Sequence, residues 1–143
     1  MVSQVSPQEE GTSMTILLID DDKEDRRYWS SALQNCPYEY VVLEADSGES
    51  GCNLFREHAV SCVVLDLDMP ESGFFTLVRL IPDCKLPHVP VVILTRLMDR
   101  ALFELVKQYG AYDCLVKHLC TIEELTKTIQ QAIALTSPMQ NGA

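Results

Sequence analysis

Positive charge is scarce in this 143-residue chain, which carries 11 lysine and arginine residues against 21 aspartate and glutamate residues. The formal net charge is therefore −10 with histidine neutral. Binding to nucleic acid depends on a basic surface that neutralises phosphates, so we expect no direct contact with nucleic acid. The same charge favours a bound metal cation or a basic partner surface.

The chain also lacks the marks of secretion, membrane insertion and zinc binding. Residues 1–13 contain neither the basic segment nor the apolar core of a signal peptide, and no apolar run approaches the ~20 residues that span a bilayer. The six cysteines form no C-x-x-C pair and have no histidine at zinc-site spacing. We therefore expect a cytoplasmic protein, away from membranes, whose cysteines are reduced and structural.

Length and composition indicate one domain. The chain is 47% hydrophobic and 22% charged, which is typical of a globular protein with a single core. Residues 1–13 are rich in Ser, Gln, Glu and Gly without periodicity, and we predict a disordered leader there. The folded domain is predicted over 14–136, and a flexible tail over 137–143.

Within the predicted domain, short apolar runs alternate with amphipathic segments. We predict strands over 14–20, 40–45, 60–66, 91–95 and 112–117. We predict helices over 23–35, 47–58, 73–81, 98–109 and 121–136, the third of them ended by Pro82. Strict alternation of this kind predicts an α/β fold, a doubly wound five-stranded parallel sheet with helices on both faces.

One stretch organises the rest, the run Val63-Val64-Leu65-Asp66-Leu67-Asp68-Met69-Pro70. Its uninterrupted aliphatic residues are typical of a strand buried on both faces. Two carboxylates and a proline cannot continue such a strand, so Asp66 is predicted at the carboxyl end of a central strand. Ligands of open α/β sheets collect at that edge.

Other predicted strands also end in polar groups. Asp20 and Asp21 follow the first strand, Thr95 ends the fourth and Lys117 ends the fifth, so all should meet Asp66 at one edge. Clustered carboxylates need a counter-charge, which Mg²⁺ and a lysine can supply. Together with a hydroxyl donor these groups form a cradle for a phosphoryl group, and an aspartate can be the nucleophile.

Simpler interpretations exist for the single residues. Asp20 and Asp21 could only cap the helix that follows them. Asp22, Glu24 and Asp25 are interpreted as first-turn and surface charge that complements the helix dipole. It is the combination of acids, hydroxyl and lysine on different strand ends that favours phosphoryl chemistry.

The sequence resembles the receiver domain of bacterial two-component response regulators over residues 14–136. The matching motifs are Leu18-Ile19-Asp20-Asp21, Val64-Leu65-Asp66-Leu67-Asp68-Met69-Pro70, Val92-Ile93-Leu94-Thr95 and Leu115-Val116-Lys117. The resemblance implies a flavodoxin-like three-layer (βα)5 sandwich.

The resemblance also implies roles for the matching residues. Asp66 would accept a phosphoryl group from the phosphohistidine of a partner kinase. Mg²⁺ would be bound directly by Asp66 and Asp21, mainly through water by Asp20, and by the backbone carbonyl of Asp68. Thr95 would bond a phosphoryl oxygen.

The resemblance also implies a role for Lys117, which would pair with the phosphoryl group. The partners would be a sensor histidine kinase or phosphotransfer protein and a downstream protein that docks on the fourth helix, fifth strand and last helix, roughly 98–136. A homodimer is compatible with such a face. The chain would then be a signalling domain and not an enzyme, with slow self-dephosphorylation at most.

The chain departs from the family pattern at several positions. The loop 69–73 is one residue shorter than usual, and Arg96 stands where a small residue is expected. Arg96 could shield the site, neutralise the phosphoryl group or point to solvent. Cys114 replaces the switch aromatic, and Tyr112, expected on the same face of the strand, could partly substitute. His118 replaces a proline after the lysine, and a cis bond there would cost ~3 kcal/mol, so we expect a trans bond.

Two other functions stay open. Asp66 and Asp68 also resemble the D-x-D motif of haloacid-dehalogenase-type phosphatases, although Pro70 does not fit that motif and a cap domain is missing. The third alternative is a pseudo-receiver, which uses the fold only for docking and has atypical switching.

Overall fold

The computed structural model describes residues 13–70, 73–84 and 88–136. The predicted leader, apart from residue 13, and the predicted tail lie outside the described residues. Among the helices that are described, none is long and apolar enough to cross a membrane. All six cysteines are free thiols, in agreement with the prediction.

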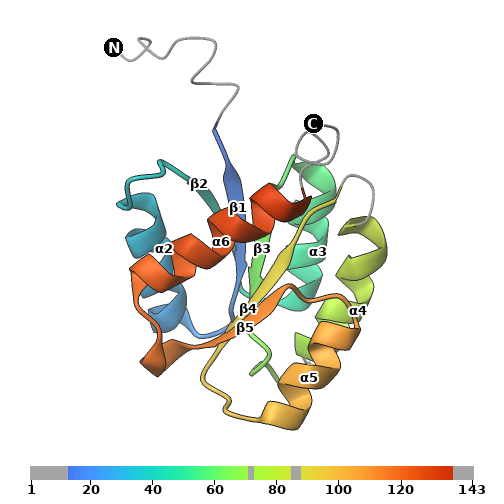
Figure 1. The fold of residues 1–143 in the computed structure, drawn as a ribbon. Coiled ribbons are helices and arrows are strands. Elements are labelled where there is room, and N and C mark those ends of the chain that lie inside the picture. Colours follow the sequence, from blue (N-terminus) through green and yellow to red (C-terminus); the bar gives the residue numbers. More distant parts are fainter. Residues whose placement is uncertain (1–12, 71–72, 85–87, 137–143) are drawn as a thin grey trace, which may run out of the picture.

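In the described residues, five parallel strands form one sheet in the order β2-β1-β3-β4-β5 (Figure 1). Their bounds are β1 Thr15–Ile19, β2 Val41–Ala45, β3 Cys62–Leu65, β4 Val91–Thr95 and β5 Asp113–Val116. This arrangement confirms the predicted doubly wound parallel sheet. It also places β3, which leads into Asp66, in the centre.

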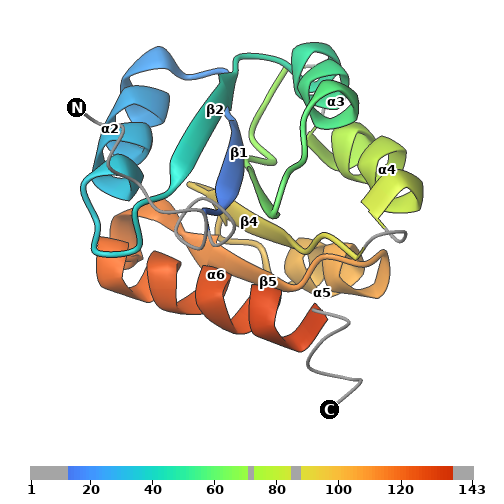
Figure 2. The same ribbon diagram turned by 90° about the horizontal axis from the view of Figure 1, so that it is seen from above.

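Helices cover both faces of the sheet (Figure 2). Their bounds are α2 Lys23–Gln34, α3 Gly48–Glu57, α4 Gly73–Cys84, α5 Arg100–Gln108 and α6 Ile122–Thr136. The first and last of these pack together on one face, and α3, α4 and α5 lie on the other. A short 3₁₀ turn, Lys117–Leu119, follows β5.

Each face of the sheet has its own apolar core, because strand side chains alternate between the two faces. In β1, Leu17 and Ile19 pack under α3, α4 and α5, whereas Ile16 and Leu18 pack under α2 and α6. All four are essentially inaccessible to water. Burying each such side chain contributes roughly 1.5–3 kcal/mol, so the central strands form a rigid base for the residues at their ends.

Side chains that bond the first-turn N–H groups fix the helix starts. The Oγ of Ser47 accepts from the N–H of Ser50 in a capping box at α3. The start of α5 was predicted too early, at residue 98. The carboxylate of Asp99 accepts from the N–H of Leu102 at 3.1 Å, so the helix begins at Arg100.

The prediction that Pro82 ends the third helix was wrong, since α4 continues to Cys84. A proline removes the hydrogen bond of its own N–H and crowds the carbonyl four residues earlier. Here that loss falls in the last turn. Leu80 and Cys84 on either side of Pro82 are buried in the core, and their packing retains the helical turn.

The carboxyl ends of the strands all lie at one edge of the sheet. Asp20 follows β1, Asp66 follows β3, Thr95 is the last residue of β4 and Lys117 directly follows β5. The N–H of Asp66 donates to the carbonyl of Ile19 at 3.0 Å, which extends the pairing of β1 and β3 up to the acids. The predicted convergence of these four positions is therefore confirmed.

Candidate functional site at the carboxyl edge of the sheet

A buried ammonium group lies at the centre of the site. The Nζ of Lys117 donates to Asp20 Oδ2 at 2.7 Å, to Asp25 Oδ2 at 2.8 Å and to Asp66 Oδ2 at 2.9 Å. Lys117 itself is 8% exposed. One cation thus joins the ends of β1, β3 and β5 and the first turn of α2.

Hydrogen bonds to the backbone hold the acids in place. Asp20 Oδ1 accepts from the N–H of Asp22 at 2.9 Å, and Asp22 Oδ1 accepts from the N–H of Asp25 at 3.0 Å. The second of these bonds caps α2. The guanidinium of Arg26 donates to the backbone carbonyl of Asp20 at 2.7 Å. The turn from β1 into α2 is therefore fixed by its own side chains.

The loop that follows β3 is fixed in a similar way. Asp66 Oδ1 accepts from the N–H of Asp68 at 2.9 Å, so both carboxylate oxygens of Asp66 have a partner. At Gly73, where α4 begins, a Cβ would clash with the backbone of Leu67 and the carbonyl oxygen of Asp66. Sequence reasoning did not single out Gly73, although its position at a loop-to-helix junction was visible.

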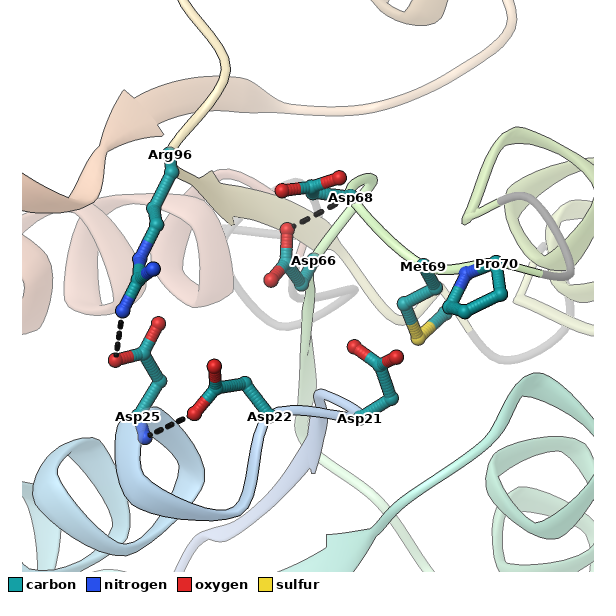
Figure 3. A pocket seen from close by; sticks show the side chains of 8 residues that line it. All are labelled: Asp21, Asp22, Asp25, Asp66, Asp68, Met69, Pro70 and Arg96. Atoms are coloured by element: carbon teal, nitrogen blue, oxygen red, sulfur yellow. Dashed lines mark hydrogen bonds and ion pairs between the residues drawn. The ribbon is translucent and has the colours of Figure 1, made fainter.

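An open cavity of about 460 Å³ lies at this edge (Figure 3). It is lined by Asp21, Asp22, Asp25, Asp66, Asp68, Met69, Pro70 and Arg96. Five carboxylates and one guanidinium thus line the cavity. Its chemistry suits a cation, or an anion that arrives together with a cation.

Burial and neighbouring charges shift the pKa values of the acids in different directions. Burial raises the pKa of Asp20 to about 6, although its hydrogen bond from Lys117 acts to lower it. Burial and the charge of Asp66 raise the pKa of Asp21. Burial alone would raise the pKa of Asp25, but hydrogen bonds from Lys117 and Arg96 outweigh this effect, so the pKa is lowered.

The same contacts fix the charge of the lysine. Burial alone would lower the pKa of Lys117, but hydrogen bonds to Asp20, Asp25 and Asp66 raise it above its ordinary value. Lys117 therefore stays an ammonium ion at neutral pH. A permanent cation at this place is what a transferring phosphoryl group requires.

Thr95 lies at the predicted strand end but outside the residues that line the cavity. Its side chain is buried, and its Oγ1 accepts from the N–H of Leu97 at 3.4 Å. The structure thus places Thr95 at the correct edge of the sheet. Its predicted bond to a phosphoryl oxygen stays a prediction.

Asp25 is the residue that sequence reasoning missed. It was interpreted as helix-start charge, yet its carboxylate bonds Lys117 and accepts from Arg96 Nη2 at 2.9 Å. A signal was available, because helical side chains lean toward the amino end and this first turn opens onto the site.

The pairing with Asp25 also answers part of the question of where the side chain of Arg96 points. Arg96 lines the cavity and is held by Asp25, so it does not simply point to solvent.

The prediction that Tyr112 shares a face with Cys114, and could thereby replace the switch aromatic in part, was wrong about the common face. Cys114 packs with the core under α3, α4 and α5, whereas Tyr112 packs with the core under α2 and α6. Tyr112 precedes the first residue of β5, so the alternation of strand side chains does not extend to it. His118 lies exposed in the 3₁₀ turn.

The donor set at the cavity fits Mg²⁺ in its chemistry. All the acidic side chains there offer oxygen ligands, and burial together with the neighbouring charge of Asp66 raises the pKa of Asp21. Within the described part of the chain, no three His, Cys, Asp or Glu side chains converge as a metal-binding group. Mg²⁺ is usually bound by only one or two carboxylates together with water, which Asp21 and Asp66 could provide.

Comparisons with known proteins point to one family. Residues 16–130 match the family model of the response regulator receiver domain. The chain is 32% identical over 118 residues to a probable chemotaxis protein CheY of Rhizobium etli, covering 80% of this chain and 88% of that protein. It is 31% identical over 104 residues to a protein-glutamate methylesterase/protein-glutamine glutaminase of Myxococcus xanthus, covering 73% of this chain but only 30% of that protein.

Solved structures agree with these matches. A response regulator receiver domain protein from Clostridium thermocellum is similar with a TM-score of 0.76 and 29% identity, covering 88% of this chain and 98% of that one. Chemotaxis protein CheY4 of Vibrio cholerae is similar with a TM-score of 0.75 and 25% identity, covering 84% and 98%. Both similarities cover more than four fifths of this chain.

Proposed function

The chain belongs to the family of response regulator receiver domains, and from that premise we propose that Asp66 is its phosphoacceptor. The observation that carries the proposal is the ammonium of Lys117, shared at 2.7–2.9 Å among Asp20, Asp25 and Asp66 beside an open acidic cavity. A nucleophilic carboxylate, a fixed cation and room for a divalent ion are the parts that phosphoryl transfer needs.

The proposed reaction is a direct transfer between two side chains. A carboxylate oxygen of Asp66 attacks the phosphorus of a phosphohistidine on the donor protein, and the phosphorus–nitrogen bond breaks. The donor imidazole keeps the bonding electron pair and takes a proton, and an acyl phosphate forms on Asp66. Water later cleaves the phosphorus–oxygen bond and regenerates the carboxylate. Lys117 pairs with the added negative charge throughout.

Receiver domains generally bind Mg²⁺, which neutralises the phosphoryl oxygens when it is bound. We assign its ligands here to the carboxylates of Asp21 and Asp66 and the backbone carbonyl of Asp68, with Asp20 acting mainly through water. Their oxygen chemistry and the acidic cavity support this assignment. Thr95 is assigned to a phosphoryl oxygen because it ends the neighbouring strand, β4.

Receiver domains interact with histidine kinases or phosphotransfer proteins, and we propose a donor of that class in the cytoplasm. The output face would lie on 98–136, where Met98, Leu105 and Leu119 are exposed apolar side chains that a partner protein could cover. The receiver domain itself is proposed to extend over 14–136. The chain spans about 30% of the methylesterases it matches, so their activity belongs to those proteins.

Incubation with Mg²⁺ and acetyl phosphate, followed by intact mass, tests the assignment. Wild type should gain one phosphoryl group. Asp66→Ala should gain none, and Asp21→Ala should load more slowly because a metal ligand is lost. Asp83→Ala, which removes an exposed acid of α4, should behave as wild type. Unchanged wild-type mass together with undetectable Mg²⁺ binding would refute the proposal, and repeated turnover of a generic phosphate ester would favour the phosphatase alternative.

A further inference from the structure

The ammonium group of Lys117 has no spare donor in this structure. It has three N–H groups, and three carboxylates accept from it, those of Asp20, Asp25 and Asp66. A phosphoryl oxygen that pairs with Lys117 must therefore displace one of the three. Which carboxylate leaves depends on its burial and on its other partners.

Asp25 is the carboxylate that can leave at least cost. The side chains of Asp20 and Asp66 are 2% and 4% exposed, and that of Asp25 is 18% exposed. The free-energy cost of separating a carboxylate from its cation is smaller when the carboxylate is nearer to water, which can solvate it. Phosphorylation neutralises the carboxylate of Asp66 but leaves the phosphoryl group on the same side chain, so residue 66 stays next to Lys117 in both states. The phosphoryl oxygens then compete with the other two carboxylates for the ammonium. Asp20 is fixed through the N–H of Asp22 and buried beneath the site.

We infer that Asp25 is a positioning residue that competes with the phosphoryl group on Asp66 for two cations, Lys117 and Arg96. The inference rests on the proposed function of Asp66. In the unphosphorylated chain the Asp25 carboxylate holds both cations, at 2.8 Å and 2.9 Å. After transfer, Lys117 exchanges Asp25 for a phosphoryl oxygen. Arg96 extends into the same cavity, and a guanidinium pairs well with phosphate (Figure 3).

This exchange links the acceptor to two segments of the chain. Asp25 belongs to the first turn of α2, where Asp22 caps its N–H. Arg96 directly follows β4, on the way to α5. When the phosphoryl group takes both cations, the connection between these two segments is lost. The unphosphorylated state is thus stabilised relative to the phosphorylated state by the charge of Asp25.

Asp25→Asn tests the competition because it removes the charge and nearly keeps the shape. Its initial rate of phosphorylation by acetyl phosphate with Mg²⁺ should rise by on the order of tenfold, the equivalent of one charge-assisted hydrogen bond. Asp25→Ala should change in the same direction. Asp25→Glu, which keeps the charge, should remain nearer to wild type. Glu24→Gln is the matched control, since it removes a charge from the neighbouring exposed position of the same helix turn.

A double-mutant cycle with Arg96→Gln identifies the second cation. The increase in phosphorylation rate caused by Asp25→Asn should be smaller in the Arg96→Gln background, because the substitution then releases only Lys117 from the carboxylate of Asp25. Urea unfolding and Mg²⁺ titration of every variant separate competition from a change in fold or in metal binding. Asp25 variants that fold, bind Mg²⁺ and load no faster than wild type would overturn the inference while the function of Asp66 stands. A wild-type chain that accepts no phosphoryl group would remove both proposals.

Discussion

Replacing Lys117 by methionine should destabilise the fold by about 3–5 kcal/mol at pH 7.5 without divalent cations, since a buried charge network then loses one partner. Methionine retains most of the side-chain volume, so the change is mainly electrostatic. Three hydrogen bonds of 2.7–2.9 Å are lost together. Asp20 and Asp66 are almost fully buried, whereas Asp25 keeps Arg96 as a partner. The two buried carboxylates therefore account for most of the lost stability.

Protonation of Asp20 can reduce the loss of stability in the Lys117→Met variant. In wild type the pKa of Asp20 is raised to about 6 although the hydrogen bond and charge of Lys117 act to lower it, so this pKa should rise further in the variant. Between pH 7.5 and about 6, Asp20 of the variant then binds more protons than Asp20 of wild type. The penalty of Lys117→Met should therefore shrink as the pH falls from 7.5 to about 6, by up to about 2 kcal/mol at 1.36 kcal/mol per pKa unit.

Urea unfolding followed by circular dichroism measures these differences. At a slope of roughly 1–3 kcal/mol per molar, the midpoint at pH 7.5 should fall by about 2 M. Lys107→Met is the control, because Lys107 forms an exposed ion pair with Asp113 at 3.3 Å and should cost at most about 1 kcal/mol. A loss below about 1 kcal/mol for Lys117→Met, unaffected by pH, would refute the view that this ammonium neutralises the buried acids.

Two further predictions concern the same edge of the sheet. Without divalent cations, the free energy of unfolding of wild type should fall as pH rises from about 4 to 6, because native Asp20, with its pKa raised from 3.8 to about 6, binds more protons than the unfolded chain in that window. Urea titrations at several pH values measure this, and a stability that rises across the window would contradict the raised pKa. Gly73→Ala should lower stability by about 1–3 kcal/mol and slow phosphorylation, because its methyl group pushes on the backbone of Leu67 and the carbonyl of Asp66. An alanine variant as stable and as quickly phosphorylated as wild type would show that the loop can give way.

The sheet and the acceptor edge could be predicted because their signals are local. Uninterrupted aliphatic runs mark strands buried on both faces, and an acid or lysine that interrupts such a run marks the strand end. Parallel connections then bring Asp20, Asp66, Thr95 and Lys117 to one edge without knowledge of side-chain positions.

The contacts of Asp25 and Arg96 could not be predicted in the same way. They are 71 residues apart, and their pairing depends on how far the long side chain of Arg96 reaches across the cavity toward Asp25. Tyr112 shows a related limit, since its face depends on where β5 begins, and strand ends are uncertain by a few residues from sequence. Pro82 is tolerated because of tertiary packing, which no local propensity contains.

Lys117 also has a mechanical consequence for β5, which within the described part of the chain is an edge strand paired only with β4. Edge strands usually separate from a sheet at either end, because neighbours hold them on one side only. Here the carboxyl end is tethered past β4 to the ends of β1 and β3. Local opening of β5 should therefore proceed from Asp113 toward Val116. The chemical state of Asp66 then sets how firmly the far end of this strand is anchored.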